Sequence, residues 1–355
     1  MVSNTPVSIP AEKLAKLIAE LFVAAGLSQQ AANTVADGLV EADIQGLNSH
    51  GVMLVEMYIE RLRKGAVTRV ELAEVSSSRQ AATVLDAANA LGHLTGDQAM
   101  SIAVDKAREF AAGIVAVRHG FHFGTAGRYA LSAANAGCIG IAMCNTRPLM
   151  PAPGGAERIV GNNPIAIALP TAGEIPIVLD MATSEAAMGK IRMAEKAKAD
   201  IPSTWAVTNE GVPTTNPTEA IAGMLLPSGG PKGFGLSFMI DLLCGLLSGG
   251  AIGSQVRPLY GDLSVPYDCS HLFIAIDVAH FCDVADFRQR AAAAAEQVRA
   301  GRRAPGVEQL FTPGEPEWRK RQYSNGTVRL EAAVVQTLHR LSAELGVTAS
   351  PLNNQ

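Results

Sequence analysis

Two short apolar runs in the middle of the chain, each bordered by polar residues, constrain the fold more than any other feature. Residues 165–169 (Ile-Ala-Ile-Ala-Leu) follow residues 161–164 (Gly-Asn-Asn-Pro), and residues 177–179 (Ile-Val-Leu) lead into Asp180. Short apolar runs rich in β-branched residues predict buried strands. The strands do not need the bordering polar residues in order to fold, so the sequence predicts a binding site where these strands end.

Thr183 and Ser184 follow Asp180 closely, and both are residue types that cap helix N-termini. We therefore expect a helix to begin directly after them. The free backbone amides at the start of such a helix would favour an anionic ligand.

Residues 1–70 are predicted to form a helical segment. Apolar residues recur with helical spacing after Pro10, and the pattern stops at Gly26. Ser28 is placed to cap a second helix, and a third is expected to end before Gly65.

Strands and helices are predicted to alternate between residues 71 and 300, and residues 301–355 form a polar, proline-containing segment that ends in a helix near 330–345. Strands are expected at 113–117, 138–143, 165–169, 177–179 and 272–276, an alanine-rich segment at 124–136, and helices at 232–248 and 285–299. The pattern predicts an α/β (α+β) protein.

Composition excludes several classes of protein. With 48% hydrophobic residues in 355, the chain can bury a large core. Its 29 basic and 33 acidic residues give a net charge of −4, which disfavours nucleic acid as a partner.

The five cysteines are odd in number and form no C-x-x-C pair, so we expect neither disulfides nor a zinc ribbon, and a reducing cytoplasmic location. The first residues lack a signal-peptide pattern, and no apolar run is expected to reach the ~18 residues of a membrane span. We expect no membrane partner.

The usual nucleotide-binding fingerprints are missing, since the chain has neither G-x-G-x-x-G after a strand nor a P-loop. Glycines instead surround Lys232 within residues 229–235, where the backbone can approach a ligand closely. Lys232 is therefore a candidate for contact with a phosphate or ribose. The alternative is a tight turn before a core helix, with Lys232 on the surface by chance.

Two histidines lie in glycine-marked turns, His50 before Gly51 and His122 before Phe123-Gly124. Because imidazole titrates near neutral pH, either could take or give the proton that accompanies hydride movement. The alternative is that each histidine only holds its turn in place.

His119 and His122 have the spacing His-x-x-His, and His271 or His280 could add a third metal ligand. Zinc sites more often have histidines four residues apart on a helix, or cysteine pairs, and a glycine follows His119. We expect no catalytic metal.

Taken together and in order, these motifs identify the chain as a member of the malate/L-lactate dehydrogenase family, which also contains ureidoglycolate and sulfolactate dehydrogenases and certain cyclic-imine reductases. The resemblance covers most of the chain and comes closest to the ureidoglycolate dehydrogenase branch at 201–217 and 240–263. The matching motifs lie at residues 49–52 with Tyr58, 122–124, 153–155, 161–164, 179–184, 189–190, 211–217, 231–235 and 313–315.

The resemblance implies a nicotinamide-dependent oxidoreductase that uses NAD or NADP. It implies a mixed-sheet nucleotide-binding domain unlike Rossmann, helical N- and C-terminal segments packed together, and a homodimer. On this basis the segments are expected at 1–70 (N-terminal helical segment), 71–300 (cofactor domain) and 301–355 (C-terminal segment packing on the N-terminal helices).

The family's functional positions carry over residue by residue. The acid/base positions match His50 and His122. The cofactor positions match Thr146, Asp180, Met181, Ala182 and Lys232, with Gly314 and Glu315 at a further corner, and Asn162 and Asn163 lie on the loop along which the cofactor is expected to run. The substrate is expected near Ser49, Leu54, Tyr58 and Arg147.

One position departs from the family pattern. The family usually reads Ser-His-Gly-x-x-Arg, and the arginine that is expected to hold the substrate carboxylate is Leu54 here. Arg147 and Arg128 are candidates to replace it, because a bidentate arginine contact to a carboxylate is strong and specific in geometry. Alternatively, Leu54 forms an apolar wall for a larger substrate.

The resulting hypothesis is hydride transfer between NAD(P) and the carbinol carbon of a small-molecule 2-hydroxy acid such as malate, L-lactate or ureidoglycolate. A second hypothesis is reduction of a cyclic imine such as a piperideine or pyrroline carboxylate. From other classes, the chain could be a metal-dependent hydrolase that uses His119, His122 and Asp180, or a protein that binds the cofactor without turnover.

Overall fold

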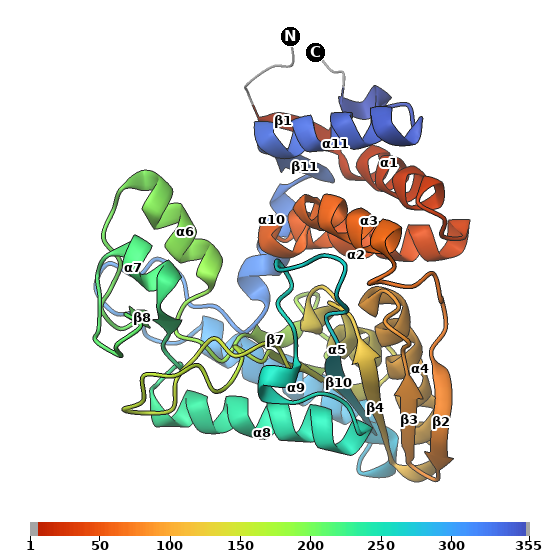
Figure 1. Cartoon of the computed structure of the whole chain (residues 1–355). Coiled ribbons are helices and arrows are strands. Elements are labelled where there is room, and N and C mark those ends of the chain that lie inside the picture. Colours follow the sequence, from red (N-terminus) through yellow and green to blue (C-terminus); the bar gives the residue numbers. More distant parts are fainter. Residues whose placement is uncertain (1–5, 353–355) are drawn as a thin grey trace.

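Helices from both ends of the chain pack together, as predicted, and a strand from each end joins them, which the sequence did not predict. The structure, a computed structural model, describes residues 6–352. Strand β1 (Val7–Pro10) pairs antiparallel with β11 (Thr327–Leu330), and α1 (Ala11–Ala24) contacts both α2 (Gln29–Ile44) and α11 (Ala332–Leu345). Figure 1 shows this group beside α3 (Val55–Lys64) and apart from the sheet.

The predicted ends of the first helices are confirmed. The Ser28 hydroxyl caps α2 by accepting a hydrogen bond from the Ala31 amide at 3.2 Å. Gly65 ends α3 in the left-handed conformation, with φ of 76°, which glycine adopts without strain.

A seven-stranded mixed sheet forms the centre of the molecule, in the order β2-β3-β4-β10-β5-β6-β7. Strands β3 and β4 are parallel and every other neighbouring pair is antiparallel, so the sheet is not a Rossmann sheet. The strands are β2 (Glu74–Arg79), β3 (Ala82–Asp86), β4 (Ala112–Gly120), β5 (Cys138–Cys144), β6 (Ile165–Leu169), β7 (Ile177–Met181) and β10 (Cys269–Asp277).

Alternating side chains of the central strands face two separate layers of helices. Val115, Val117 and Phe273 join the main core with α4 (Gly92–Phe110) and α5 (Ala126–Asn135). Ala116 and Leu272 point the other way, toward α8 (Pro231–Ser248). This period of two is what a sheet covered on both faces requires.

A smaller lobe, drawn in green at the left of Figure 1, has a core of its own. It holds α6 (Met188–Ala197), β8 (Ala206–Val207), α7 (Pro217–Ala222) and β9 (Met224–Leu225). Its buried residues form a cluster separate from the main core. They are Met150, Val160, Ile191, Ile201, Ala206, Ala220 and Leu225.

Helix α8 is exceptional because it is long and apolar enough, by length and composition alone, to cross a membrane. It is the one such helix in the described part of the chain, which is weak support for a span, and one side of it packs against the sheet. Lys232 and Asp241 interrupt its apolar sequence.

The remaining helices complete the chain. They are α9 (Val284–Arg299), α10 (Glu315–Tyr323) and the 3-10 turns η1 (Asn48–His50), η2 (Val52–Leu54), η3 (Gly253–Gln255), η4 (Val278–His280) and η5 (Ser350–Leu352). The segment boundaries at residues 70 and 300 stay predictions, since one continuous core includes residues of all three segments.

One local prediction is wrong. Thr183 and Ser184 do not cap a helix, because α6 begins only at Met188 and its N-cap is Ala187. Ser184 instead forms an isolated bridge with Pro227, so the chain stays extended beyond β7. The anion-binding amides expected directly after Asp180 are therefore absent at that point.

Candidate active site

His122 and His50 come together beside Tyr58, as the predicted acid/base role requires. His122 follows β4, and its Nδ1 lies 2.6 Å from the hydroxyl oxygen of Tyr58 on α3. The rings of His50 and His122 stack with centroids 5.5 Å apart. Tyr58 is fully buried, whereas both histidines remain partly open to solvent.

The surroundings of His50 and His122 favour the neutral form of both imidazole rings. Burial lowers the pKa of His122 well below its usual 6.5, and repulsion from His50, His93 and His271 adds to this effect. Burial also lowers the pKa of His50. Because burial raises the pKa of Tyr58 well above 10, Tyr58 remains a phenol and can accept a hydrogen bond from Nδ1–H of His122.

Asp43 supports the turn that carries His50, a role that sequence reasoning missed. Its Oδ2 accepts a hydrogen bond from the Val52 amide at 2.8 Å. A Cβ on Gly51 would lie 2.1 Å from Asp43 Oδ1, so only glycine fits there. Burial raises the pKa of Asp43 to about 6. Ser49 is exposed, with its Oγ 3.0 Å from His50 Nδ1.

His93 is a second buried group that the sequence did not reveal. It lies in the first turn of α4, fully buried, and its ring centroid is 6.1 Å from that of Tyr58. Burial, with repulsion from Arg128 and His50, lowers its pKa to about 3. The His93 ring is therefore neutral near pH 7.

Only one of the two arginines predicted to replace the family arginine is free. Arg128 donates to both carboxylate oxygens of Asp97, at 3.2 and 2.7 Å. Arg147 is half-buried and has no hydrogen bond or ion pair within residues 6–352. Burial lowers its pKa, as does repulsion from Arg158 and Arg192. An unpaired, partly desolvated guanidinium is suited to bind an anion.

Leu54 is only 1% exposed and belongs to the main core. Arg147, in contrast, interacts electrostatically with Tyr267, whose ring packs edge-on against Phe121 at 6.0 Å. Phe121 directly precedes His122.

The Asn162–Asn163 loop is tied to Thr146 by hydrogen bonds. Oδ1 of Asn163 accepts from the Thr146 amide at 2.7 Å, and its Nδ2 donates to the Ser237 carbonyl at 2.9 Å. The Thr146 hydroxyl donates to Oδ1 of Asn162 at 3.1 Å. Asn163 is fully buried, so the structure places it as a support for Thr146.

Asp180 lies where β7, the edge strand of the sheet, meets α5. Its Oδ2 accepts a hydrogen bond from the Gly127 amide at 2.8 Å. The side chain is exposed to solvent, yet surrounding protein desolvates it enough to raise its pKa to about 6. Met181 and Ala182, the next residues, are half-buried.

Two hydroxyls beyond Asp180 lack partners. Oγ1 of Thr183 and Oγ of Ser184 are buried and make no hydrogen bond within the described residues. Since buried polar atoms are almost always hydrogen-bonded, these two atoms fit a polar ligand seated beside β7.

Lys232 lies in the first turn of α8, exposed and without an ion pair in residues 6–352. Gly229 and Gly230 precede it with φ of 61° and 62°, which favours glycine. A cavity of about 260 Å³ adjoins this turn and is lined in part by Gly154, Gly155, Gly211, Pro227 and Gly230.

Glu315 is not free to bind a ligand. Its buried carboxylate accepts hydrogen bonds from Arg299 at 2.8 Å and from Arg319 at 2.8 and 2.9 Å. Gly314 fits closely against β7, because a Cβ there would lie 2.8 Å from the Val178 carbonyl oxygen. The structure therefore places this corner as a support for β7.

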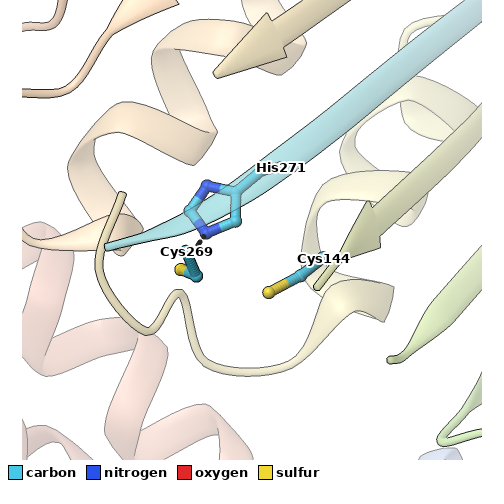
Figure 2. A group of neighbouring side chains, drawn as sticks. All are labelled: Cys144, Cys269 and His271. Carbon is cyan, nitrogen blue, oxygen red and sulfur yellow. Dashed lines mark hydrogen bonds between the residues drawn. The ribbon is translucent and has the colours of Figure 1, made fainter. Parts of the chain in front are cut away.

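The residues of the hydrolase hypothesis do not form a metal-binding group. His119 Nδ1 lies 2.9 Å from Asp86 Oδ1, and His122 is bonded to Tyr58. Within residues 6–352, one group of three potential ligands converges, namely Cys144, Cys269 and His271, shown in Figure 2.

Comparisons with known proteins agree with this geometry. The sequence profile of the malate/L-lactate dehydrogenase family matches residues 9–339. A malate dehydrogenase of Pyrococcus abyssi (strain GE5 / Orsay) is 37% identical over 322 residues, 88% of either chain. A ureidoglycolate dehydrogenase (NAD(+)) of Escherichia coli (strain K12) is 38% identical over 309 residues, 87% of this chain and 88% of that protein.

Solved structures show the same fold. Sulfolactate dehydrogenase from Methanocaldococcus jannaschii matches with a TM-score of 0.91 and 34% identity, over 96% of this chain and 98% of that one. Delta1-piperideine-2-carboxylate reductase from Pseudomonas syringae pvar.tomato matches with a TM-score of 0.84 and 29% identity, over 94% and 99%. The chain is an oxidoreductase that acts on CH–OH groups, and it belongs to the malate/L-lactate dehydrogenase family.

Proposed function

We propose that this chain is an NAD(P)-dependent dehydrogenase of a 2-hydroxy acid, with His122 as the acid/base group. The observation that carries the proposal is the neutral, partly open imidazole of His122, held at Nδ1 by Tyr58 at 2.6 Å. A bound nicotinamide supplies the hydride acceptor for oxidation and the hydride donor for reduction.

The hydrogen bond between Tyr58 and His122 determines which ring nitrogen of His122 can exchange a proton with the substrate. When Nδ1–H donates to the Tyr58 oxygen, Nε2 carries a lone pair and can accept the proton of a substrate hydroxyl. The imidazolium that forms keeps its bond to Tyr58 and can return the proton from Nε2. Stacked His50, in the turn held by Asp43, limits the positions that the His122 ring can adopt.

Arg147 is the group that we propose to bind the substrate carboxylate. It is half-buried and unpaired within residues 6–352, whereas Arg128 is engaged by Asp97 and Leu54 carries no charge. A bidentate contact from Arg147 would orient the carbinol carbon between His122 and the cofactor.

The residues present fit a dinucleotide. Asp180 can accept hydrogen bonds from ribose hydroxyls, and the unpartnered hydroxyls of Thr183 and Ser184 can bond to polar groups beside β7. Lys232 can neutralise a phosphate. The loop that carries Thr146 forms a further part of the proposed cofactor site, and Asn163 supports it by accepting a hydrogen bond from the Thr146 amide.

The decisive experiment is a matrix of initial velocities with NAD and NADP against malate, L-lactate, sulfolactate, ureidoglycolate and Δ1-piperideine-2-carboxylate. We expect turnover of at least one 2-hydroxy acid with one preferred nicotinamide. If the folded protein oxidises none of the acids but reduces the imine, the substrate class that we propose is wrong.

Imine reduction is the second candidate. It is supported by the structural similarity to Delta1-piperideine-2-carboxylate reductase and by the apolar Leu54 at the position of the family arginine. Where the substrate nitrogen already carries its proton, loss of His122 would reduce turnover less than in alcohol oxidation.

We also propose a homodimer that buries the outer side of α8. Leu246, Leu247 and Met239 are 62%, 53% and 52% exposed there, and Asp241, the charged residue between them in sequence, is buried against Asn145. An apolar surface of this kind on a folded protein favours association. Light scattering should give twice the mass of the chain, and Leu246→Glu should yield monomers; a monomeric parent protein would refute the dimer.

A further inference from the structure

Two cysteines and a histidine converge inside the sheet, next to the candidate active site but outside its chemistry. Cys144 is the last residue of β5, and the strand register places it opposite His271 on β10. The pairing of β10 with β4 shifts between Cys269 and His271, a bulge that changes the direction of the Cys269 side chain.

The ligand atoms of these three residues all lie within 4.8 Å of one another. Cys269 Sγ is 3.2 Å from His271 Nε2, and Figure 2 shows both sulfurs on the side of the ring that carries this nitrogen. The three side chains are 3%, 0% and 0% exposed for Cys144, Cys269 and His271. Metal–ligand bonds of about 2.0–2.3 Å would put the ligand atoms of one ion about 3.5–4 Å apart, which this spacing allows.

We propose that Cys144, Cys269 and His271 form a binding site for one thiophilic d10 cation, Zn²⁺ or Cu⁺. Thiolate and imidazole are the ligands that both ions prefer. Cu⁺ can be held by the three side chains alone. Zn²⁺ needs a fourth ligand in addition, so the three side chains fit Cu⁺ better.

The protonation states agree with such a site. Burial raises the pKa of Cys144, but hydrogen bonds from Cys269 and His271 outweigh it and lower the pKa to about 6. Burial holds the pKa of Cys269 well above 9. Both cysteines would bind the ion as thiolates, so binding should release protons and strengthen as pH rises.

A bound ion would connect β5 to β10 directly beneath the loop that carries Thr146 and Arg147. His271 also stacks on Phe123, with ring centroids 4.7 Å apart, and Phe123 follows His122. The ion would therefore stabilise the strands that hold both halves of the active site. It is not required for the proton transfer assigned to His122.

The experiment uses the full chain, reduced, stripped of metal and free of affinity tags. Zn²⁺ is added in competition with a chromophoric zinc chelator, and Cu⁺ in competition with a bicinchoninate-type ligand. Co²⁺ gives a further readout, since thiolate ligands produce sulfur-to-cobalt charge-transfer absorption. We expect one equivalent of Zn²⁺ or Cu⁺ to bind, and Cys144→Ser and Cys269→Ser to weaken binding by about 100-fold or more.

Cys138→Ser and Cys282→Ser are the matched controls, one for a buried thiol and one for an exposed thiol outside the group. Both should bind the ion like the parent protein. If Cys144→Ser or Cys269→Ser does not fold, the parent protein and its controls still decide the question. Binding of neither ion by the folded, reduced parent would overturn the proposal, as would loss of binding in Cys282→Ser.

Discussion

Asp180 at the end of β7 and Glu315 at the start of α10 lie in one neighbourhood, where the Val178 amide donates to the Pro313 carbonyl. Glu315 is buried, with both carboxylate oxygens bonded to arginines, and these bonds outweigh the effect of burial and lower its pKa to about 2. Asp180 is exposed, with one hydrogen bond and a pKa raised to about 6 by desolvation. One carboxylate holds the fold together, and the other has oxygens free for a ligand.

The same difference separates other residues that look equivalent in sequence. Arg128 is paired and Arg147 is not; Asn163 uses its amide within the protein, and Lys232 has no partner in the described residues. Residues whose polar atoms are already bonded support the site. Residues whose polar atoms remain free, together with His122, are the ones that we expect to touch ligands.

His122→Ala tests the largest effect. Turnover should fall by about 10²-fold or more, because the substrate hydroxyl loses its proton acceptor, while nicotinamide affinity stays nearly unchanged. Steady-state rates and fluorescence titration measure the two quantities. His119→Ala, which removes a ring bonded to Asp86, is the control. An unchanged rate in His122→Ala would remove this residue from the mechanism.

Glu315→Gln should lower the free energy of unfolding by about 3 kcal/mol, because Arg299 and Arg319 lose their shared anion. The pKa of Glu315 is lower in the folded state, so its contribution is complete above pH 4.5 and is lost as pH falls toward about 2. Urea unfolding of the parent and the variant at pH 7 and pH 3 measures both the loss of stability and its dependence on pH. Exposed Glu344→Gln is the control and should leave stability nearly unchanged. Weaker cofactor binding without loss of stability would contradict the assignment.

Arg147→Gln should raise KM for a 2-hydroxy acid by about 30-fold, equivalent to about 2 kcal/mol for a lost charge-assisted contact. Arg128→Gln should mainly lower stability, because it leaves Asp97 unpaired. Steady-state kinetics combined with thermal unfolding separates the two. Equal KM values in the parent and Arg147→Gln would show that another group binds the carboxylate.

Asp180→Asn should have the smallest effect, and one that depends on pH. Nicotinamide affinity of the parent should rise by less than about tenfold from pH 5 to 7.5, as the carboxylate ionises around its pKa of about 6. Between pH 3.8 and about 6 the folded state binds more protons at Asp180 than the unfolded state does. Its contribution to stability therefore falls as pH rises through that range, and the variant should lack both trends. A parent affinity that is independent of pH would argue against contact with Asp180.

Much of the fold could be predicted because its signals are local. The strands at 113–117 and 272–276, the Ser28 cap and the Gly65 stop follow from residue type and spacing alone. Helix α4 gave no such signal, since Gly92, Gly96 and polar His93 lie on its buried face, where tertiary packing overrides propensity.

The site was predicted less completely, because its support comes from contacts distant in sequence. The sequence around Gly51 does not indicate that the Asp43 side chain packs against it. The sequence around Glu315 does not indicate that Arg299 bonds to its carboxylate. The Thr183 and Ser184 prediction failed because good cap residues also occur in extended chain, where another partner, here Pro227, decides the conformation. The order of the motifs identified the family. The folded structure was needed to separate supporting residues from residues whose polar atoms are free.

The small lobe of α6, α7, β8 and β9 has a practical consequence for turnover. Seven buried residues of the lobe and its neighbouring loop form a cluster separate from the main core, so we expect the lobe to loosen without disturbing the sheet. The cavity beside Gly230 is lined by residues from this lobe and from its neighbouring loop. We expect motion of this lobe, on the microsecond to millisecond scale, to pace entry and release of the nicotinamide that we propose.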